Sequence, residues 1–428
     1  MAQKRVAVIG AGAAGLAMCR YLVNEPQIDF VAFEKANAVA GIWRYTKENG
    51  KAINEHDITP MYKNLRTNLP KQVMAFPDLP FPNELPSFIT NQDVVQYLDT
   101  YAECFGLKKY IKLNHLVTSV KPIIDGSDAE PSWDVVVKDL KTEAVEKFVF
   151  DAVVVCNGHF AVPKFPEFPG MDTFPGNVIH SLDYDKQDNY QDETVVVLGA
   201  GSSGLDIAME LSQVSKKVYL VHLYNKIASE LPKNVQEISG TITACFANGS
   251  VEINHDELLE KVNAIIICTG YHYSFPFLKQ ECGINVKNNA IFSLYKHIFC
   301  TKYPSLAFVG ICIRISPFPF FSAQAQCIAS VLCGRKTLPS FDEMVKDEES
   351  DYQDRLQQGI TKHLLGPERQ FKYCTMLAEM TEVPCAISQT VHSLFVYTCK
   401  IRSQRLATYK NSNFVLNGNE WQTVKNVI

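Results

Sequence analysis

Two glycine-rich segments of the same spacing are the residues of this chain most suited to chemistry. The first is Gly10-Ala11-Gly12-Ala13-Ala14-Gly15, and the second is Gly199-Ala200-Gly201-Ser202-Ser203-Gly204. Each follows an apolar, β-branched run and opens a stretch with helical spacing. In that context the GxGxxG pattern holds the pyrophosphate of a dinucleotide against a helix N-terminus. Two such segments predict two dinucleotide sites in one chain.

The first segment has what a dinucleotide site needs. Gly10 allows a tight turn, Gly12 lets a pyrophosphate approach the backbone, and Gly15 lets the helix pack closely on the strand. The apolar run 30–33 ends at Glu34, where an acid can accept both hydroxyl groups of an adenosine ribose. From these residues alone, FAD and NAD are both compatible with the site.

The second segment differs at the position that selects the cofactor. Its second strand, 217–222, ends at His222, where an NAD site usually has a carboxylate. A carboxylate would repel a 2′-phosphate, whereas a neutral or basic residue tolerates one, so NADPH is favoured over NADH. The nearby cations Lys216, Lys217 and Lys226 either meet that phosphate or belong to an ordinary solvated surface.

The elements that must position these segments form two βαβ units. Strands at 6–9 and 30–33 flank a helix at 13–22, and the second unit runs from 195 to about 223. Thr90 and Asp93 predict a capping box, and 133–137 and 147–150 predict an antiparallel pair. Apolar runs at 151–156 and 264–268 predict buried strands that each end in a glycine turn. A hairpin turn is expected at 248–250, where the same residues also match a glycosylation sequon.

We therefore predict an α/β fold with two doubly wound, Rossmann-like dinucleotide-binding domains, the smaller inserted in the larger. A proline-rich stretch at 163–175 marks the expected crossing between them. The larger domain is predicted at 1–168 and 285–428, with helices near the C-terminus, and the smaller at 169–284.

Composition excludes several classes of protein. The net charge of -5 gives no electrostatic reason for nucleic acid as a partner. The 13 cysteines contain no CxxC pair, which argues against a disulfide framework and a zinc ribbon. His180 has no partner ligands at metal-site spacing, so no metal site is expected. Residues 306–332 are interrupted by Arg314 and prolines, so we expect a buried strand and helix rather than a membrane span. The acidic run 346–351 is expected on a solvated face. Met1-Ala2-Gln3 leads directly into the first strand, so we expect no signal peptide and a soluble, cytoplasmic protein, with a homodimer as the default assembly.

A third motif lies between the two glycine-rich segments. Phe174-Pro175-Gly176-Asn177-Val178-Ile179-His180-Ser181-Leu182-Asp183-Tyr184 matches FxGxxxHxxx(Y/F), and the chain resembles the flavin-containing monooxygenases that carry this signature. Ala40-Gly41-Ile42-Trp43-Arg44-Tyr45 resembles the GGxWR segment of that family, with Ala40 in place of its glycine. Leu65-Arg66-Thr67-Asn68-Leu69-Pro70-Lys71 resembles its RTNxPK segment, and Cys268-Thr269-Gly270-Tyr271 its TGY strand end. The chain lacks the hydrophobic C-terminal tail of vertebrate members and looks more like the soluble yeast and insect members.

The resemblance implies FAD at the first site, in the larger domain, and NADPH at the second. It implies hydride transfer to the flavin, reaction with dioxygen to a C(4a)-hydroperoxide, and oxygenation of a tertiary amine, an alkaloid or a sulfide. It implies that Asn68 lies near the flavin and the peroxide, where its amide can hydrogen-bond without titrating. Arg66 either balances charge on the reduced flavin or pairs at the surface. Further cofactor contacts are expected at Lys35, Ile42, Trp43, Thr67, Val117 and Gln324.

Several residues keep two interpretations. Trp43 either packs on FAD or is a core aromatic, and His180 is either a hinge or cofactor-wall residue or a buried, hydrogen-bonded histidine. A helix expected to start near Ser322 either aims its N-terminus at the flavin or serves core packing. The aromatic stretch 318–321 lines the pocket or, as we favour, belongs to the core.

Other functions share some of these features. A Baeyer–Villiger ketone monooxygenase uses the same cofactors, but its motif usually ends differently from Tyr184. NADPH oxidase activity is a further alternative, and a non-enzymatic nucleotide sensor is disfavoured most. A flavin disulfide reductase would need a redox CxxxxC pair, which the chain does not have.

Overall fold

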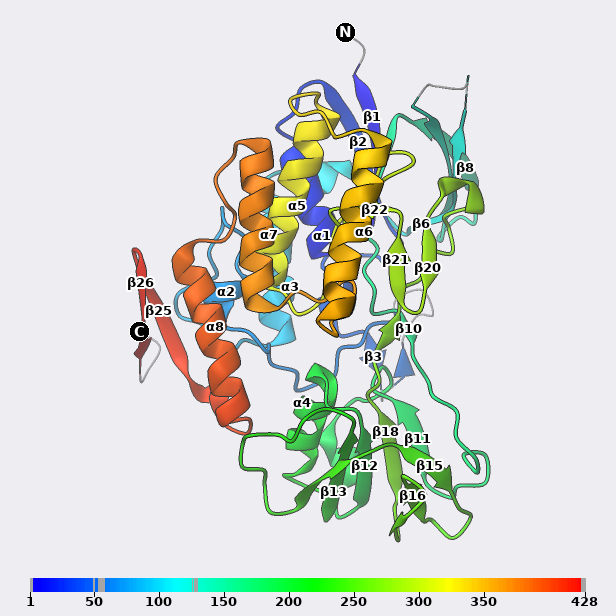
Figure 1. Cartoon of the computed structure of the whole chain (residues 1–428), viewed down its shortest axis with the longest axis vertical. Helices are drawn as coiled ribbons and strands as arrows, with labels where there is room; N and C mark the ends of the chain where they lie inside the picture. The colour runs from blue at the N-terminus through cyan, green and yellow to red at the C-terminus, as the bar shows by residue number, and fades with distance from the viewer. Residues whose placement is uncertain (1–2, 49–50, 53–57, 125, 127–129, 425–428) are drawn as a thin grey trace.

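The larger sheet places the first glycine-rich loop at its centre. The computed structural model describes residues 3–48, 51–52, 58–124, 126 and 130–424 (Figure 1); Met1 and Ala2, on which the expectation about a signal peptide depends, lie outside this range. The strand order is β22-β23-β24-β9-β1-β2-β5, and β1 pairs in parallel with both β2 and β9. The strands of this sheet are β1 (Lys4–Ile9), β2 (Ile28–Glu34), β5 (Ile111–Leu113), β9 (Ala152–Val155), β22 (Leu294–Tyr295), β23 (Phe299–Cys300) and β24 (Leu306–Phe308).

The second sheet repeats this arrangement around the second loop. Its order is β11-β18-β12-β13-β14, with every neighbouring pair parallel. Its strands are β11 (Asn177–His180), β12 (Thr194–Leu198), β13 (Lys217–His222), β14 (Val235–Ser239) and β18 (Ala264–Ile267). In each sheet the first strand of the βαβ unit lies between the second strand of that unit and a buried strand that ends in a glycine turn. The predicted α/β class is confirmed.

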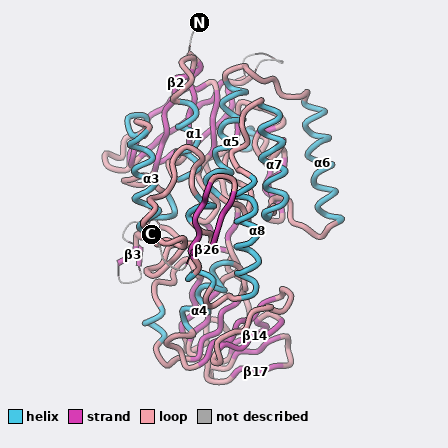
Figure 2. Tube along the Cα trace, turned by 90° about the vertical axis from the view of Figure 1, so that its left-hand side faces the viewer, coloured by secondary structure: helices cyan, strands magenta, loops and turns pink. Residues whose placement is uncertain are grey.

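Helices cover the larger sheet and link it to the smaller one. Figure 1 shows α5, α6 and α7 in front of the larger sheet, with α4 and the smaller sheet below them. The helices are α1 (Ala13–Leu22), α2 (Lys71–Met74), α3 (Asn91–Cys104), α4 (Ser202–Leu211), α5 (Pro317–Leu332), α6 (Phe341–Gln357), α7 (Gly366–Thr381) and α8 (Gln389–Gln404). Figure 2 shows that α8 extends toward the part of the molecule that contains α4.

The remaining strands form small sheets at the edges. They are β3 (Lys47–Glu48), β4 (Lys51–Ala52), β6 (His115–Ile123), β7 (Ser132–Asp139), β8 (Val145–Phe150), β10 (Val162–Pro163), β15 (Ile242–Cys245), β16 (Val251–Ile253), β17 (Glu257–Leu259), β19 (Tyr271–His272), β20 (Asn285–Lys287), β21 (Ala290–Phe292), β25 (Asn413–Asn417) and β26 (Glu420–Val424). The expected antiparallel pair is β7 with β8, and the expected hairpin is β15 with β16. The capping box of Thr90 and Asp93 is present at the start of α3.

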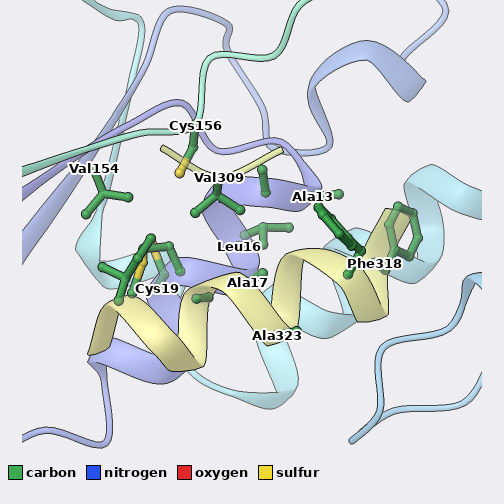
Figure 3. Close-up of a cluster of buried hydrophobic side chains, with 14 of the residues drawn as sticks. Ala13, Leu16, Ala17, Cys19, Val154, Cys156, Val309, Phe318 and Ala323 are labelled. Carbon is green, nitrogen blue, oxygen red and sulfur yellow. The ribbon is translucent and has the colours of Figure 1, made fainter. Parts of the chain in front are cut away.

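The core beneath the first loop is formed where α1 crosses α5. Figure 3 shows small side chains of α1, such as Ala13 and Ala17, against Ala323 and Phe318 of α5. Small residues allow the two helix backbones to approach, while Phe318 fills the space at the start of α5. This packing fixes the N-terminus of α1, and with it the first glycine-rich loop.

The start of α5 corrects one prediction. The helix begins at Pro317 and not near Ser322, because proline is well tolerated in a first helical turn, where the backbone N–H has no intrahelical partner. Phe318 and Phe320 are fully buried, and Phe318 stacks on Phe76 with ring centroids 5.0 Å apart. The core interpretation of the aromatic stretch is therefore confirmed, and the N-terminus of the helix lies more than one turn before Gln324.

The acidic run of α6 corrects a second prediction. Three of its carboxylates form ion pairs instead of facing only solvent, two with cations outside α6 and one with a cation of α6 itself. Glu348 lies 2.6 Å from the buried Lys362, and Asp351 lies 2.6 Å from the buried Arg355. Asp347 pairs with Lys296, also at 2.6 Å. The buried cations Lys362 and Arg355 need these partners, since an unpaired charge is costly to bury.

Two expectations concern absence. None of the helices in the described residues is long and apolar enough to cross a membrane. Within those same residues, no group of three or more histidine, cysteine or acidic side chains is placed to hold a metal ion.

Candidate functional site

The first glycine-rich loop is shaped by backbone contacts that only glycine permits. Gly10 has φ of 102°, and a Cβ there would lie 2.6 Å from the carbonyl oxygen of Cys156. A Cβ on Gly15 would lie 1.9 Å from the carbonyl oxygen of Gly10. At Gly12 the nearest atom to an added Cβ is the Cα of Gly41, at 3.5 Å. Gly10 and Gly15 therefore provide a turn and a close helix–strand contact, and Gly12 lies against the backbone of Gly41.

Glu34 braces this loop from the end of β2. Its carboxylate is 6% exposed and accepts hydrogen bonds from the backbone N–H of Ala11 at 2.7 Å and of Ala36 at 2.9 Å. The side chain therefore lies beside the fingerprint, as expected of a ribose-binding acid. Lys35, the next residue, is exposed.

A second loop, residues 40–43, lies over the first. Ala40 donates to the carbonyl of Ala11 at 3.2 Å and has φ of 82°, a left-handed conformation that disfavours any residue with a Cβ. The glycine usual at this position in the resembling family would adopt it without strain. Trp43 packs edge-on against Phe318, with centroids 6.3 Å apart, and both Trp43 and Ile42 are half-buried.

The 65–71 segment is held by side chains that bond to backbone. Thr67 is buried and exchanges two hydrogen bonds with Ile89, one through its backbone N–H and one through Oγ1. Arg66 donates from Nε to Phe88 O at 3.2 Å and from Nη2 to Lys410 O at 2.7 Å. Two nitrogens of this half-buried guanidinium thus bond to backbone carbonyl oxygens.

Lys71 closes the same segment. Its Nζ donates to the carbonyl oxygens of Pro82, Asn83 (3.0 Å) and Leu85 (2.6 Å). Burial lowers the pKa of this ammonium. The lysine at the end of the motif therefore organises a loop and is not available to a ligand.

Asn68 presents an amide with one end occupied. The phenol of Tyr409 donates to Asn68 Oδ1 at 3.3 Å. The Nδ2 group has no hydrogen-bond partner among the described residues, and the side chain is half-buried. The amide can therefore offer two donors to a molecule in the site.

The second glycine-rich loop repeats the geometry of the first. Gly199 has φ of 107°, and a Cβ on Gly204 would lie 1.8 Å from Gly199 O. An added Cβ at Gly201 would meet no atom within 4 Å. Ser202 and Ser203 form the first turn of α4, whose free N–H groups point out of the helix end. The space beside Gly201 suits a phosphate at a helix N-terminus.

His222 lies at the end of β13 but faces inward. It is 3% exposed, its Nδ1 accepts from the Tyr224 N–H, and its Nε2 lies 3.1 Å from the Glu237 carboxylate. Glu237 also accepts from the Ile227 N–H at 2.8 Å. The loop beyond β13 is open, with Lys226 exposed on it.

The 174–184 motif connects strands of the second sheet to each other and to α4. His180 is 1% exposed; its Nδ1 accepts from the Leu182 N–H, and its Nε2 contacts the Gly270 carbonyl at 3.1 Å. It is thus a buried, hydrogen-bonded histidine that joins the ends of β11 and β18. Tyr184 donates to Glu210 of α4 at 2.9 Å, in a setting where burial raises the pKa of Glu210 to about 7.

Comparison with known proteins identifies the fold and its family. The family model described as flavin-binding monooxygenase-like matches residues 3–229 and 223–418. The chain belongs to this family. It is 32% identical to "Flavin-containing monooxygenase FMO GS-OX-like 2" of Arabidopsis thaliana, in an alignment that covers 96% of this chain and 91% of that protein. The resemblance predicted from the motifs is confirmed, and the chain is a flavin-containing monooxygenase.

Solved structures agree with this monooxygenase fold. S-allyl-L-cysteine S-oxygenase from Allium sativum is 32% identical and superposes with a TM-score of 0.85, covering 96% of this chain and 95% of that one. Cyclohexanone monooxygenase from Rhodococcus sp. Phi1, solved with NADP+, is 13% identical with a TM-score of 0.59 and shares the fold. The predicted cofactors, FAD and NADPH, are those that the flavin-containing monooxygenase family uses.

One arginine that the sequence did not indicate lies beside the second glycine-rich loop. Arg402, in the last turn of α8, has Nη1 and Nη2 at 3.5 and 3.4 Å from Ser202 Oγ. Its Nε is buried and has no hydrogen-bond partner within the described part of the chain. Nothing in the sequence signals this contact, because the two residues are 200 positions apart.

Two predicted contacts lie within the core of the monooxygenase. Val117 is 5% exposed in β6, opposite Val137. Gln324 is fully buried; its Oε1 accepts from the Gly310 N–H at 2.9 Å, and its Nε2 donates to Tyr373 Oη at 3.0 Å. Both ends of the Gln324 amide are therefore engaged, and a cofactor contact by either residue stays a prediction.

Proposed function

We propose that this monooxygenase uses FAD, NADPH and dioxygen to oxygenate the sulfur of small thioethers, with tertiary amine nitrogen as a second class of substrate. The observation that favours sulfur is the 32% identity, over nearly the whole chain, to a structure named as an S-oxygenase. Both substrate classes are soft nucleophiles that need no protein base for activation, which agrees with a site built from amides and glycines.

The first loop fits FAD. The N-terminus of α1 suits a pyrophosphate, and the Glu34 carboxylate beside it suits an adenosine ribose. Trp43 and Ile42 lie on the loop that covers the fingerprint. We assign FAD to this site and residues 1–168 and 285–428 to the domain that holds it.

The second loop fits NADPH. The empty space at Gly201 and the start of α4 are suited to the pyrophosphate, and Arg402 supplies the cation beside them. The exposed Lys226 is our candidate for the 2′-phosphate, since His222 is turned inward toward Glu237. We assign residues 169–284 to this domain.

The chemistry is supplied by the cofactors and the setting by the chain. When bound, FAD and NADPH supply the electrons with which one oxygen atom enters the substrate and the other leaves as water. Asn68 offers neutral N–H donors that do not titrate, so it can hold an oxygen atom without delivering a proton. The 40–43 loop lies against the first fingerprint through the Ala40–Ala11 hydrogen bond, and Trp43 of this loop packs on Phe318.

A ketone monooxygenase is the second candidate. It is favoured only by the shared fold with cyclohexanone monooxygenase. Against it, the last position of the central motif is Tyr184, whose phenol is committed to Glu210.

The proposal is tested by NADPH oxidation in air with thioethers, tertiary amines and ketones, each product being identified by mass. We expect yellow protein, consumption of NADPH over NADH, and sulfoxide as the preferred product. Conversion of ketones to esters with no sulfoxide would replace sulfur oxygenation by the second candidate. Protein that takes up no flavin would overturn the proposal entirely.

A further inference from the structure

The end of α8 and the turn that follows it lie between the two proposed cofactor sites. We call residues 402–410 the C-terminal strap. Besides the contact of Arg402 with Ser202, the Leu406 N–H donates to Ser229 Oγ at 2.9 Å, next to the loop that carries Lys226. Figure 1 shows the lower end of α8 beside the part of the molecule that contains α4. The strap therefore contacts the NADPH side along its length.

Lys410 joins the strap to both sides at once. Its Nζ donates to Asp206 Oδ2 of α4 at 2.7 Å and to Arg66 O at 2.9 Å. Arg66 returns a hydrogen bond to Lys410 O at 2.7 Å. The Lys410 and Asp206 side chains are 18% and 9% exposed, so the ion pair is largely shielded from water and salt.

Tyr409 makes the hydrogen bond that orients the carboxamide of Asn68. Its ring is 1% exposed and packs edge-on against Phe88, with centroids 5.3 Å apart. Burial raises the pKa of its phenol, so the group stays a neutral donor. Because it donates to Asn68 Oδ1, it fixes which end of the carboxamide faces the site.

We propose that the C-terminal strap positions Asn68, with Tyr409 setting the orientation of the amide and Lys410 its place relative to α4. The inference rests on the function proposed for Asn68. With the amide held, NADPH, H⁺, O₂ and a thioether give NADP⁺, water and a sulfoxide. With the amide turned, its donors are lost from the site, and NADPH, H⁺ and O₂ give NADP⁺ and hydrogen peroxide instead. The strap thus governs how much NADPH is consumed productively.

The test is Tyr409→Phe, which removes only the hydroxyl. The matched control is Tyr397→Phe, whose ring packs in the same C-terminal cluster, 4.7 Å from Trp421. The measured quantity is hydrogen peroxide released per NADPH at saturating methyl phenyl sulfide. We expect a several-fold rise for Tyr409→Phe and none for Tyr397→Phe. The double variant Lys410→Met/Asp206→Asn, which leaves the net charge unchanged, is expected to raise the hydrogen peroxide released per NADPH as well. It removes the hydrogen bonds by which Lys410 connects the segment of Asn68 to α4.

A double-variant cycle shows whether Tyr409 acts through Asn68. In an Asn68→Ala background, adding Tyr409→Phe is expected to change neither the peroxide fraction nor the thermal midpoint of the flavin-free protein further. Full additivity in both measurements would overturn the inference. The inference would also be overturned if Tyr409→Phe released no more hydrogen peroxide per NADPH than the wild type while Asn68→Ala released more. That result would leave the role of Asn68 intact. If Asn68→Ala released no more hydrogen peroxide per NADPH than the wild type, both the role of Asn68 and the inference would be overturned.

Discussion

The carboxylate of Glu34 accepts a buried hydrogen bond from the backbone N–H of Ala11, at 2.7 Å. Its other oxygen accepts from the Ala36 N–H. The acid that ends β2 therefore holds the middle of the first glycine-rich loop, and it does so through backbone atoms. If FAD binds here as proposed, loop shape and ribose recognition depend on the same side chain.

Glu34→Gln is expected to weaken FAD binding by about tenfold or more, because the amide turns one acceptor into a donor that faces backbone N–H groups. The measurement is the FAD dissociation constant, from quenching of flavin fluorescence. Asp29→Asn, exposed on the same strand, is the control and is expected to bind as the wild type does. Equal affinity in Glu34→Gln would show that the carboxylate is not required.

Gly201→Ala and Gly204→Ala distinguish a glycine that leaves room for the ligand from a glycine that the packing of the fold requires. The Gly201 methyl group meets no protein atom, so we expect an unchanged thermal midpoint and a KM for NADPH raised about tenfold or more. Gly204→Ala places a methyl group 1.8 Å from a backbone oxygen and is expected to destabilise the fold. An unchanged KM in Gly201→Ala would contradict a pyrophosphate at that position.

Lys226→Glu tests the 2′-phosphate assignment. If Lys226 meets this phosphate, the KM for NADPH rises more than the KM for NADH, because only NADPH carries the group. The exposed Lys216→Glu is the matched charge reversal and should leave the ratio unchanged. Arg402 lies beside the N-terminus of α4, so Arg402→Gln is expected to raise the KM for NADPH and the KM for NADH alike. An unaltered ratio in Lys226→Glu would assign the phosphate elsewhere.

The buried pair of His363 and His297 leads us to expect that the protein becomes less stable at acidic pH. His363 accepts from the Ile291 N–H at Nε2, and its Nδ1 lies 3.2 Å from His297 Nδ1. Burial, with Arg355 nearby, lowers the pKa of His297 to about 3; burial and His297 hold that of His363 well below its usual value. Both rings are thus neutral in the fold.

Because the folded pKa values are depressed, the stability that these histidines contribute is present above the unfolded value, about 6.5, and is lost as pH falls toward 3. The free energy of unfolding should fall by up to about 1.4 kcal/mol per pH unit for each histidine that takes up a proton on unfolding. His363→Gln, which keeps an acceptor for Ile291, should flatten this slope, whereas the exposed His255→Gln should not. An equal slope in His363→Gln would exclude the pair as the cause.

Asn68→Asp tests the amide. A carboxylate has no N–H donors and carries a charge, so FAD should remain bound while substrate oxygenation falls strongly. Flavin content and sulfoxide yield are measured on the same preparation. Undiminished sulfoxide yield would remove Asn68 from the site.

The parts that could be predicted from sequence are those specified by local chemistry. The turn at Gly10, the contact at Gly15 and the cap at Thr90 each depend on residues close in the chain. Glu34 could be placed because parallel strands β1 and β2 bring their carboxyl ends to one edge.

The parts that could not be predicted depend on contacts between distant segments. Arg402 reaches Ser202, and Tyr409 reaches Asn68, across hundreds of residues with no motif to mark them. The start of α5 at Pro317 depends on how its first turn packs in the core. The pairing of Glu348 could not be predicted because its partner Lys362 lies beyond α6. His180 could be named from its motif, but its bond to Gly270 needed the sheet order.

The most direct measurement of the central claim is the source of the oxygen in the product. Methyl phenyl sulfide is incubated with the purified flavoprotein and NADPH under ¹⁸O₂ in ordinary water, and the sulfoxide is examined by mass spectrometry. The account predicts one labelled oxygen atom in each sulfoxide formed and close to one NADPH oxidised for each. Unlabelled sulfoxide, or NADPH oxidation that yields hydrogen peroxide alone, would contradict it.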